Sequence, residues 1–209
     1  MPADKPDLDT AYALETPEDN RALYAGWAET YEETFARAMD FRMPGHVAQK
    51  FVETGGQGPV LDAGAGTGLL GQALHDAGIP DIDGLDLSPE MLDVARRKNV
   101  YRDLVVGDMT RPLPLPDATW YGIVSSGTFT HGHVGPDAFD ELMRVAAPGA
   151  LFVVTIKTEL FDSAGFGAKF AGFGGKIKGL ESVELPIYGP AATGDHRDDK
   201  GLVVSFRKS

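Results

Sequence analysis

The sequence of 209 residues contains no cysteine, so disulfide bonds and thiolate metal sites are excluded, and the redox compartment is not indicated. No apolar run approaches the roughly 18 residues that are needed to cross a bilayer. Residues 1–9 also contain no basic region followed by an apolar stretch, which a secretory signal would require. From these absences we expect a cytoplasmic protein with no membrane partner.

Basic side chains are scarce as well, because 19 Lys and Arg stand against 31 Asp and Glu and give a formal net charge of −12 at pH 7. Such a charge repels polyanions, so we expect no nucleic-acid partner. Hydrophobic residues make up 43% of the chain, which is enough for one core. We therefore expect one structural domain, with an N-terminal extension and helical lid at residues 1–54 and a core at residues 55–209.

The most informative stretch of the sequence is a glycine-rich turn at residues 60–71. A short strand pattern ends in Asp62, and glycines and a helix pattern follow it. Glycines allow the bend and leave bare N–H groups for a ligand at the helix N-terminus. Residues 66–71 also satisfy the G-x-G-x-x-G pattern of dinucleotide enzymes. The carboxylate of Asp62 favours a cationic ligand over a diphosphate. S-adenosylmethionine (SAM), with a sulfonium and an ammonium group and no phosphate, is therefore preferred to NAD. A turn that only packs helix on strand is the remaining alternative.

Strand and helix patterns alternate after this turn, which is typical of a parallel doubly wound sheet. Residues 164–179 carry phenylalanines at helical spacing among several glycines, so a poor helix or a mobile segment is expected there. Two strand-like stretches joined by a polar loop follow and must be antiparallel neighbours. The predicted strands after the turn are 82–85, 104–106, 121–125, 151–156, 183–188 and 202–206, and the predicted helices are 69–77, 88–98 and 136–147.

Before the turn, apolar residues recur from residue 18 to residue 38 at the spacing of one amphipathic helix, and a second helix is expected over residues 45–52. Tyr24 and Tyr31 are seven residues apart, so a single helix would project both from the same face. Each tyrosine also offers a polar hydroxyl at the tip of an apolar ring. The helix is therefore predicted to act as a lid.

Acidic residues also follow the next two predicted strands. Asp86 lies 18 residues beyond Gly68, where a carboxylate can accept hydrogen bonds from both hydroxyls of a ribose. Asp108 follows the third strand, and for this residue a simple turn aspartate is the alternative. Two strand-end carboxylates beside the glycine turn strengthen the prediction of a nucleoside-containing ligand.

His131 and His133 follow the fourth predicted strand. An imidazole with an unperturbed pKa near 6.5 is suited to act as a general base at neutral pH. The alternatives are a helix cap or a hydrogen bond to a loop carbonyl. A metal site would combine His131 and His133 with Asp137. The sequence does not fix a third ligand beside the two histidines, so no metal is expected.

Six motifs occur together: Tyr24-x-x-Trp27-Ala28-x-x-Tyr31, Phe41-Arg42-x-Pro44, Leu61-Asp62-x-Gly64-x-Gly66-Thr67-Gly68, Gly84-x-Asp86-x-Ser88-Pro89-x-Met91-Leu92, Gly132-His133-Val134 and Leu142-x-Arg144-Val145-x-x-Pro148-Gly149. Through them, roughly residues 24–207 resemble the class I SAM-dependent methyltransferases, in particular the methyltransferase-like proteins of the Williams-Beuren region type. The resemblance implies an α/β fold with a doubly wound, seven-stranded Rossmann-like sheet, an antiparallel last strand and an N-terminal helical lid.

The resemblance also implies which residues hold SAM. Tyr24 and Tyr31 match lid tyrosines that close over the methionyl group. The remaining implied cofactor-binding residues are Asp62, Gly64 and Gly66 at the methionine part, Asp86 and Leu87 at the ribose, Asp108 and Met109 at the adenine, and the backbone near Ser125 at the sulfonium.

The acceptor stays undefined by these motifs. The fourth strand ends in Ser125-Ser126-Gly127, where amino-methylating enzymes of nucleic acids carry Asn- or Asp-Pro-Pro-Tyr and metal-dependent catechol-type enzymes carry an acid. We predict methyl transfer to a small-molecule acceptor by in-line displacement, with His131 and His133 as candidate catalytic residues and a monomer or homodimer as the assembly. An NAD-linked oxidoreductase and a SAM-binding protein without transferase activity are the alternatives.

Overall fold

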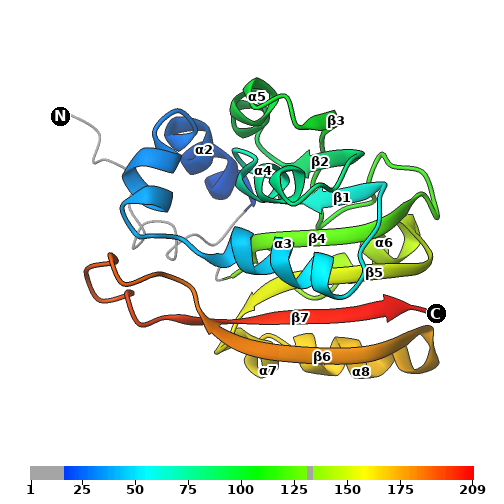
Figure 1. Cartoon of the computed structure of the whole chain (residues 1–209). Helices are drawn as coiled ribbons and strands as arrows, with labels where there is room; N and C mark the ends of the chain where they lie inside the picture. The colour runs from blue at the N-terminus through cyan, green and yellow to red at the C-terminus, as the bar shows by residue number, and fades with distance from the viewer. Residues whose placement is uncertain (1–16, 131–133) are drawn as a thin grey trace.

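The computed structural model describes residues 17–130 and 134–209. Within these residues seven strands form one sheet, in the order β3-β2-β1-β4-β5-β7-β6, and helices cover both of its faces (Figure 1). The strands are β1 (Val60–Ala63), β2 (Ile82–Asp86), β3 (Tyr101–Val106), β4 (Trp120–Phe129), β5 (Ala146–Lys157), β6 (Ile177–Pro186) and β7 (Lys200–Lys208). The helices are α2 (Pro17–Trp27), α3 (Met43–Glu53), α4 (Leu69–Asp76), α5 (Pro89–Arg97), α6 (Ala138–Val145), α7 (Leu160–Ser163) and α8 (Phe166–Phe173), with a π-helical segment η1 (Glu32–Arg37) and a 3-10 turn η2 (Gly174–Lys176).

The directions of the strands confirm the predicted topology. β1 is parallel to β2 and β4, β2 is parallel to β3, and β4 is parallel to β5. β7 runs antiparallel to both β5 and β6, so it alone is reversed in the sheet. The order of the strands reverses between β1 and β4. In open α/β sheets, ligands bind outside the carboxyl ends of the strands at such a switch point.

Side chains alternate across each strand and therefore build two cores, one on each face of the sheet. Val60 of β1 packs in the cluster that contains Phe51 of α3 and Leu74 of α4. The next residue, Leu61, belongs to the opposite cluster, which contains Phe139 of α6. Over the described ranges 17–130 and 134–209, every helix is too short or too polar to cross a bilayer.

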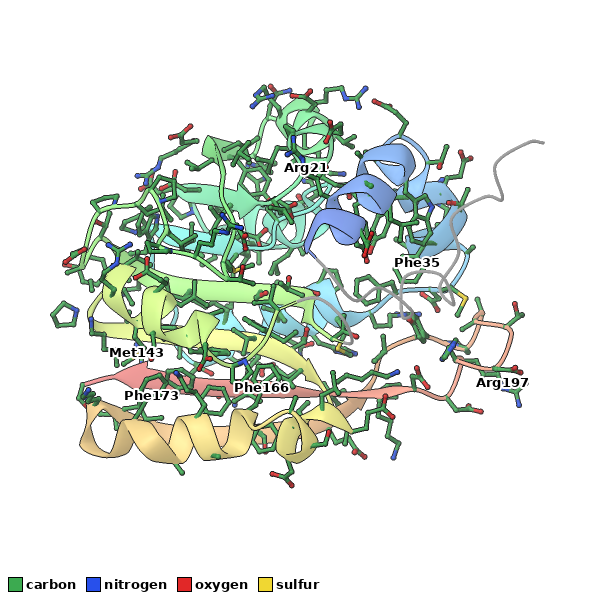
Figure 2. The ribbon with its side chains drawn as sticks, turned by 180° about the vertical axis from the view of Figure 1, so that it is seen from behind. Arg21, Phe35, Met143, Phe166, Phe173 and Arg197 are labelled. Carbon is green, nitrogen blue, oxygen red and sulfur yellow. The ribbon has the colours of Figure 1, made fainter. Side chains whose placement is uncertain are left out.

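The glycine-rich stretch at residues 164–179 is a helix followed by a strand. Phe166 and Phe170 of α8 are each 1% exposed and belong to the core that α6 also covers. Figure 2 shows Phe166 and Phe173 on this side of the sheet. Burial of these rings outweighs the low helix propensity of the glycines. From Ile177 onwards the chain forms the edge strand β6.

The prediction of one continuous helix over residues 18–38 is wrong. α2 ends at Trp27, a turn occupies residues 28–30, and π-helical η1 follows. The Trp27 indole N–H donates a hydrogen bond of 2.9 Å to Thr34 Oγ1, and the Trp27 ring lies 5.7 Å from the ring of Phe35. The turn thus buries two aromatic rings that a straight helix would separate.

The fourth strand is also longer than predicted. β4 continues to Phe129, which pairs with Ile156 of β5 after a register shift. Gly127 has a φ of 76° at this irregularity, and its N–H donates to Thr155 Oγ1 at 2.9 Å. The strand therefore extends four residues beyond its predicted end at residue 125, and these residues lie at the carboxyl end of β4, where the switch point opens.

Candidate functional site

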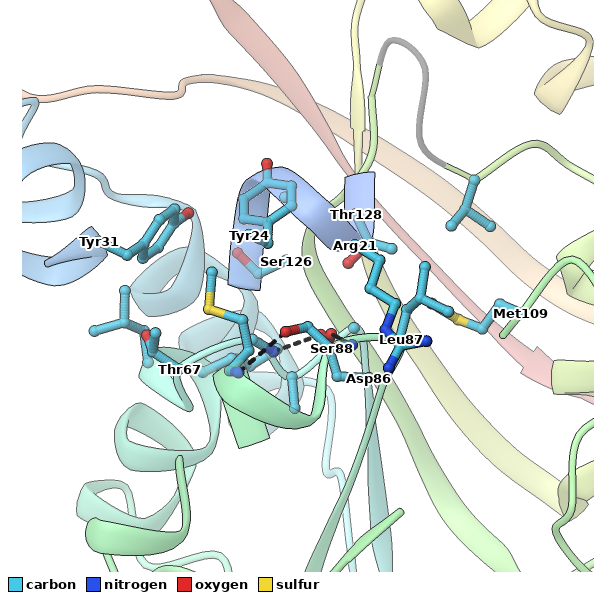
Figure 3. A pocket seen from close by; sticks show the side chains of 18 of the residues that line it. Arg21, Tyr24, Tyr31, Thr67, Asp86, Leu87, Ser88, Met109, Ser126 and Thr128 are labelled. Atoms are coloured by element: carbon cyan, nitrogen blue, oxygen red, sulfur yellow. Dashed lines mark hydrogen bonds between the residues drawn. The ribbon is translucent and has the colours of Figure 1, made fainter. Parts of the chain in front are cut away.

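A pocket lies at the carboxyl ends of β1 to β4, beneath the N-terminal helical segment (Figure 3). It contains about 990 Å³ of empty space, including its open mouth. The residues that line it are Arg21, Tyr24, Tyr31, Phe41, Pro44, Gly64, Ala65, Gly66, Thr67, Leu69, Leu70, Asp86, Leu87, Ser88, Met91, Gly107, Asp108, Met109, Thr110, Ser126, Gly127, Thr128 and Val134.

The glycine turn forms one wall of the pocket. The N–H groups of Gly64 and Ala65 both donate to the carbonyl of Leu85, at 2.8 and 2.9 Å, and so tie the turn to β2. A Cβ added at Gly64 would lie 2.1 Å from Thr128 Oγ1, so this glycine allows the close approach of β4. A Cβ added at Gly66, where φ is 52°, would meet nothing within 4 Å. Gly66 therefore leaves room for a ligand against the backbone.

Asp86 is held at the pocket by two backbone donors, shown as dashed lines in Figure 3. Its Oδ2 accepts from Gly66 N–H at 2.8 Å, and its Oδ1 accepts from Ser88 N–H at 2.9 Å. Burial raises the pKa of Asp86, and the N–H donors of Ser88, Gly66 and Leu87 oppose that rise. The carboxylate thus joins the end of β2 to the glycine turn and lines the pocket.

Asp62 lies elsewhere than expected. Its side chain is fully buried, does not line the pocket, and accepts a hydrogen bond of 2.7 Å from the hydroxyl of Tyr101. Burial raises the pKa of Asp62 to about 7, and the negative charge of Asp86 adds to the rise, while the bonds from Tyr101 and from the backbone of Gly71 oppose it. We therefore correct the expected direct contact with a ligand to a supporting position behind the pocket wall, where the carboxylate bonds the first turn of α4.

The ring of Tyr101 fills a slot between glycines. A Cβ added at Gly71 would lie 2.2 Å from the Tyr101 hydroxyl oxygen, and one added at Gly68 or at Gly84 would lie 3.0 or 3.1 Å from the ring. Two glycines of the G-x-G-x-x-G pattern thus make room for a tyrosine, as close packing of helix and strand requires. Their presence does not by itself indicate a dinucleotide.

Asp108 and Met109 both line the pocket, as predicted, but Asp108 also stabilises its own turn. Its Oδ1 accepts from the N–H of Thr110 at 2.8 Å and from the Thr110 hydroxyl at 2.6 Å. Its Oδ2 lies 3.3 Å from Arg111 Nε. The structure therefore bears out the turn-aspartate alternative and leaves an additional ligand contact possible, because a carboxylate oxygen has more than one lone pair.

Tyr24 and Tyr31 both line the pocket although they belong to separate segments. Their ring centroids are 6.1 Å apart in an edge arrangement, and Figure 3 shows both rings above the pocket. Ion pairs tie this region to the end of α5, with Arg97 2.7 Å from Glu29 and Lys98 2.8 Å from Glu32. The helical segment therefore covers the mouth of the pocket.

Two hydroxyls at the pocket wall were not identified from the sequence. Thr67 Oγ1 and Ser126 Oγ are buried and have no hydrogen-bond partner among the described residues. Such groups are costly to bury unless a ligand or water satisfies them. The Ser125 side chain is fully buried and donates to the carbonyl of Ala63 at 2.6 Å, whereas the next residue, Ser126, lines the pocket. The predicted contact of the backbone near Ser125 with the sulfonium stays a prediction.

Other lining residues also escaped the sequence interpretation. Arg21 reaches from α2 toward Leu87 (Figure 3), and Phe41 enters from the segment before α3. No motif marks either position for a ligand. His131 and His133 lie outside the described residues. Within residues 17–130 and 134–209, no group of three or more His, Asp or Glu side chains could hold a metal ion.

Comparison with known proteins adds a family to this geometry. Residues 61–154 match the methyltransferase domain family. The chain is 31% identical over 142 residues to methyltransferase-like protein 27 of Homo sapiens, covering 65% of this chain and 57% of that protein. It is 41% identical over 66 residues to the 18S rRNA (guanine-N(7))-methyltransferase of Bos taurus, covering 32% of this chain and 23% of that protein. The chain spans about half the length, or less, of the curated relatives it matches.

A solved structure supports the fold. The TehB-like SAM-dependent methyltransferase of Corynebacterium glutamicum superposes with a TM-score of 0.61, at 22% identity, over 90% of this chain and 99% of that one. At this identity the likeness bears on the fold alone. The topology that the sequence predicts, the matched domain and the superposition therefore agree.

The buried carboxylate predicts a pH dependence of stability. Because the folded pKa of Asp62 is about 7 and the unfolded pKa is about 4, the folded state binds an extra proton between these values, and stability falls as pH rises through this window. From pH 5 to pH 8 we expect wild type to lose about 2 to 3 kcal/mol more unfolding free energy than Asp62→Asn. Denaturant unfolding at both pH values measures the difference.

Asp93→Asn, at an exposed carboxylate of α5, is the control and should show the same change in unfolding free energy as wild type. Parallel pH profiles for wild type and Asp62→Asn would contradict the raised pKa of Asp62 in the folded state.

Proposed function

Because the chain belongs to the class I SAM-dependent methyltransferases, we propose that it transfers the methyl group of SAM to a small-molecule acceptor by in-line displacement. The observation that carries the proposal is the convergence of the glycine turn, Asp86 and the two tyrosines on one pocket at the switch point. The acceptor and the activity of the whole protein are parts of the proposal.

The residues of the pocket fit SAM. Gly66 leaves open space at the backbone, and the unsatisfied hydroxyls of Thr67 and Ser126 offer hydrogen bonds to polar groups of a ligand. We assign the ribose hydroxyls to Asp86, and the adenine to the apolar side chain of Met109. Asp108 would accept from the adenine amino group, because its pairing with Arg111 is solvent-exposed and therefore weak.

Methyl transfer needs little covalent help from the protein. SAM supplies an activated methyl group on a sulfonium, and the chain supplies positioning and the exclusion of water. Tyr24 and Tyr31 would close over the methionyl part, which accounts for a lid built from two short aromatic segments. A base is required only for an acceptor that arrives protonated.

His131 and His133 stay the proposed bases. The residue before them, Thr130, lines an adjoining cavity, and the residue after them, Val134, lines the cofactor pocket. The described residues on either side of the two histidines in the sequence therefore line the two spaces. This connection supports a role for the histidines beside the reacting groups.

A small acceptor is favoured over RNA by the distribution of charge. The net charge is −12, and each cation of the basic run at residues 96–98 has an acidic neighbour, with Arg96 beside Asp93, Arg97 beside Glu29 and Lys98 beside Glu32. These acids lower the positive potential that would attract the phosphates of a polyanion. The likeness to an rRNA methyltransferase makes RNA the alternative acceptor to test.

Calorimetric titration tests the cofactor. We expect binding of S-adenosylhomocysteine, the demethylated product, and no comparable binding of NAD, because a pocket with strand-end carboxylates disfavours a diphosphate. Tight binding of NAD without a response to S-adenosylhomocysteine would instead select an oxidoreductase.

The acceptor class is tested by incubating the protein with methyl-labelled SAM and with either the small-molecule fraction or the RNA fraction of a cell extract. The measured quantity is the label that each fraction gains. Label should enter the small-molecule fraction. Label in RNA would replace the acceptor class that we propose, and binding without any transfer would indicate a SAM-binding protein with no transferase activity.

Asp86→Ala should weaken the binding of S-adenosylhomocysteine by about 1.5 to 3 kcal/mol, the scale of hydrogen bonds to a charged group. The carboxylate also holds the N–H groups of Gly66 and Ser88, so the melting temperature must be measured in parallel. Asp93→Ala, at the exposed carboxylate that pairs with Arg96, is the matched control and should bind normally. An unchanged affinity in folded Asp86→Ala would remove the ribose role.

Closure of the lid should be visible by hydrogen exchange. Since cofactor must enter before the tyrosines cover it, residues 18–38 should exchange faster in the free protein than with S-adenosylhomocysteine bound. Residues 138–145 of α6 pack in the core of the other face and should not change. Equal protection of residues 18–38 in both states would exclude a lid.

A further inference from the structure

A second cavity lies beside the cofactor pocket. Tyr24, Tyr31, Phe41 and Gly127 line both spaces, so the two share a wall. The second cavity extends from this wall toward the end of β5. None of the groups assigned to SAM in the ribose and adenine part of the pocket lines it.

Aromatic rings dominate this second space, which we call the aromatic chamber and define by Trp27, Phe35, Phe41, Phe129, Tyr188 and Lys157. The rings come from α2, η1, the segment before α3, the end of β4 and the segment after β6. Their centroids lie at contact distances, with 5.7 Å between Trp27 and Phe35, 5.5 Å between Phe35 and Phe41, and 6.1 Å between Phe41 and Tyr188.

Backbone pairing fixes the part of the wall that comes from the far end of the chain. Phe41 and Tyr188 form an antiparallel bridge, and the N–H of Arg42 donates to the carbonyl of Ile187 at 2.9 Å. The N–H of Gly189 donates to the carbonyl of Asp40 at 2.8 Å. The chamber is thus a built cavity. Flat rings suit such walls, because aromatic pairs favour offset or edge contacts at these distances.

The charge in the wall is paired. Lys157 is the one charged residue among the described residues that line the chamber, and its side chain is 9% exposed. Its Nζ lies 3.0 Å from Glu159 and 3.2 Å from Asp199, neither of which lines the chamber. Two carboxylates therefore balance the Lys157 charge, so this lysine does not present an uncompensated positive charge to an occupant. An occupant of the chamber would be held by the rings rather than by charge.

We propose that the aromatic chamber is the acceptor site and that the acceptor is a flat aromatic molecule. This proposal rests on the proposed function. In the reaction a lone pair on the nucleophilic atom of the acceptor forms the new bond to the methyl carbon, and the electron pair of the broken carbon–sulfur bond stays on sulfur. A proton displaced from that nucleophilic atom leaves to a base or to water.

Methionine methyl groups report on both spaces in one NMR experiment. Met109 and Met91 line the cofactor pocket, Met43 lines the chamber, and Met143 lines neither. With methionine methyl groups labelled with carbon-13 in the full chain, S-adenosylhomocysteine should shift the signals of Met109 and Met91. Addition of 2-naphthol to that complex should shift the signal of Met43 through the ring current, and the signal of Met143 should stay in place.

The outcomes separate the two proposals. A response of Met109 and Met91 with no response of Met43 to 2-naphthol would overturn the chamber assignment and leave the cofactor assignment standing. Silence of Met109 and Met91 toward S-adenosylhomocysteine would overturn the proposed function, and the acceptor assignment with it.

Discussion

The hydrogen bond between Tyr101 and Asp62 is the contact on which the geometry of the site depends. It joins the start of β3 to the end of β1 across β2, and the ring lies in a slot that Gly68, Gly71 and Gly84 leave open. Because the backbone of Gly71 in the first turn of α4 also lies against this carboxylate, one buried acid links two strands and a helix. The glycine turn can then present its backbone to a ligand while its far side is tightly packed.

Asp86 continues this arrangement at the pocket itself. Its two oxygens accept from backbone groups on either side, at Gly66 and Ser88, and so join the end of β2 to the turn and to the start of α5. The two buried acids raise the cost of each other's charge, and a ligand with a cationic group would relieve that cost. The same repulsion therefore lowers the stability of the folded protein without ligand and favours a ligand with a cationic group.

The N-terminal helical segment connects the two spaces of the molecule. It carries Tyr24 and Tyr31 to the shared wall, and it carries Trp27 and Phe35 to the aromatic chamber. Two ion pairs hold the segment against α5. Arg97 and Lys98 at the end of α5 pair with Glu29 and Glu32 of the segment. Ion pairs at a surface are weak and exchange readily with water, which suits a segment that must open.

Local pattern determined the alternation of strands and helices, the glycine turn and the strand-end acids, because each of these is encoded within a few neighbouring residues or within one strand-helix repeat. The seven-stranded sheet and the role of the two tyrosines followed from the family resemblance instead. Only the tertiary structure decided what faces the pocket. A strand period of two residues cannot tell whether Ser125 or Ser126 reaches the ligand after an irregularity at Gly127, and the charge of Asp62 does not reveal that Tyr101, 39 residues away, covers it. The aromatic chamber could not be predicted from the sequence for the same reason. Phe41 and Tyr188 are distant in the sequence and are brought together by an antiparallel bridge in the folded protein.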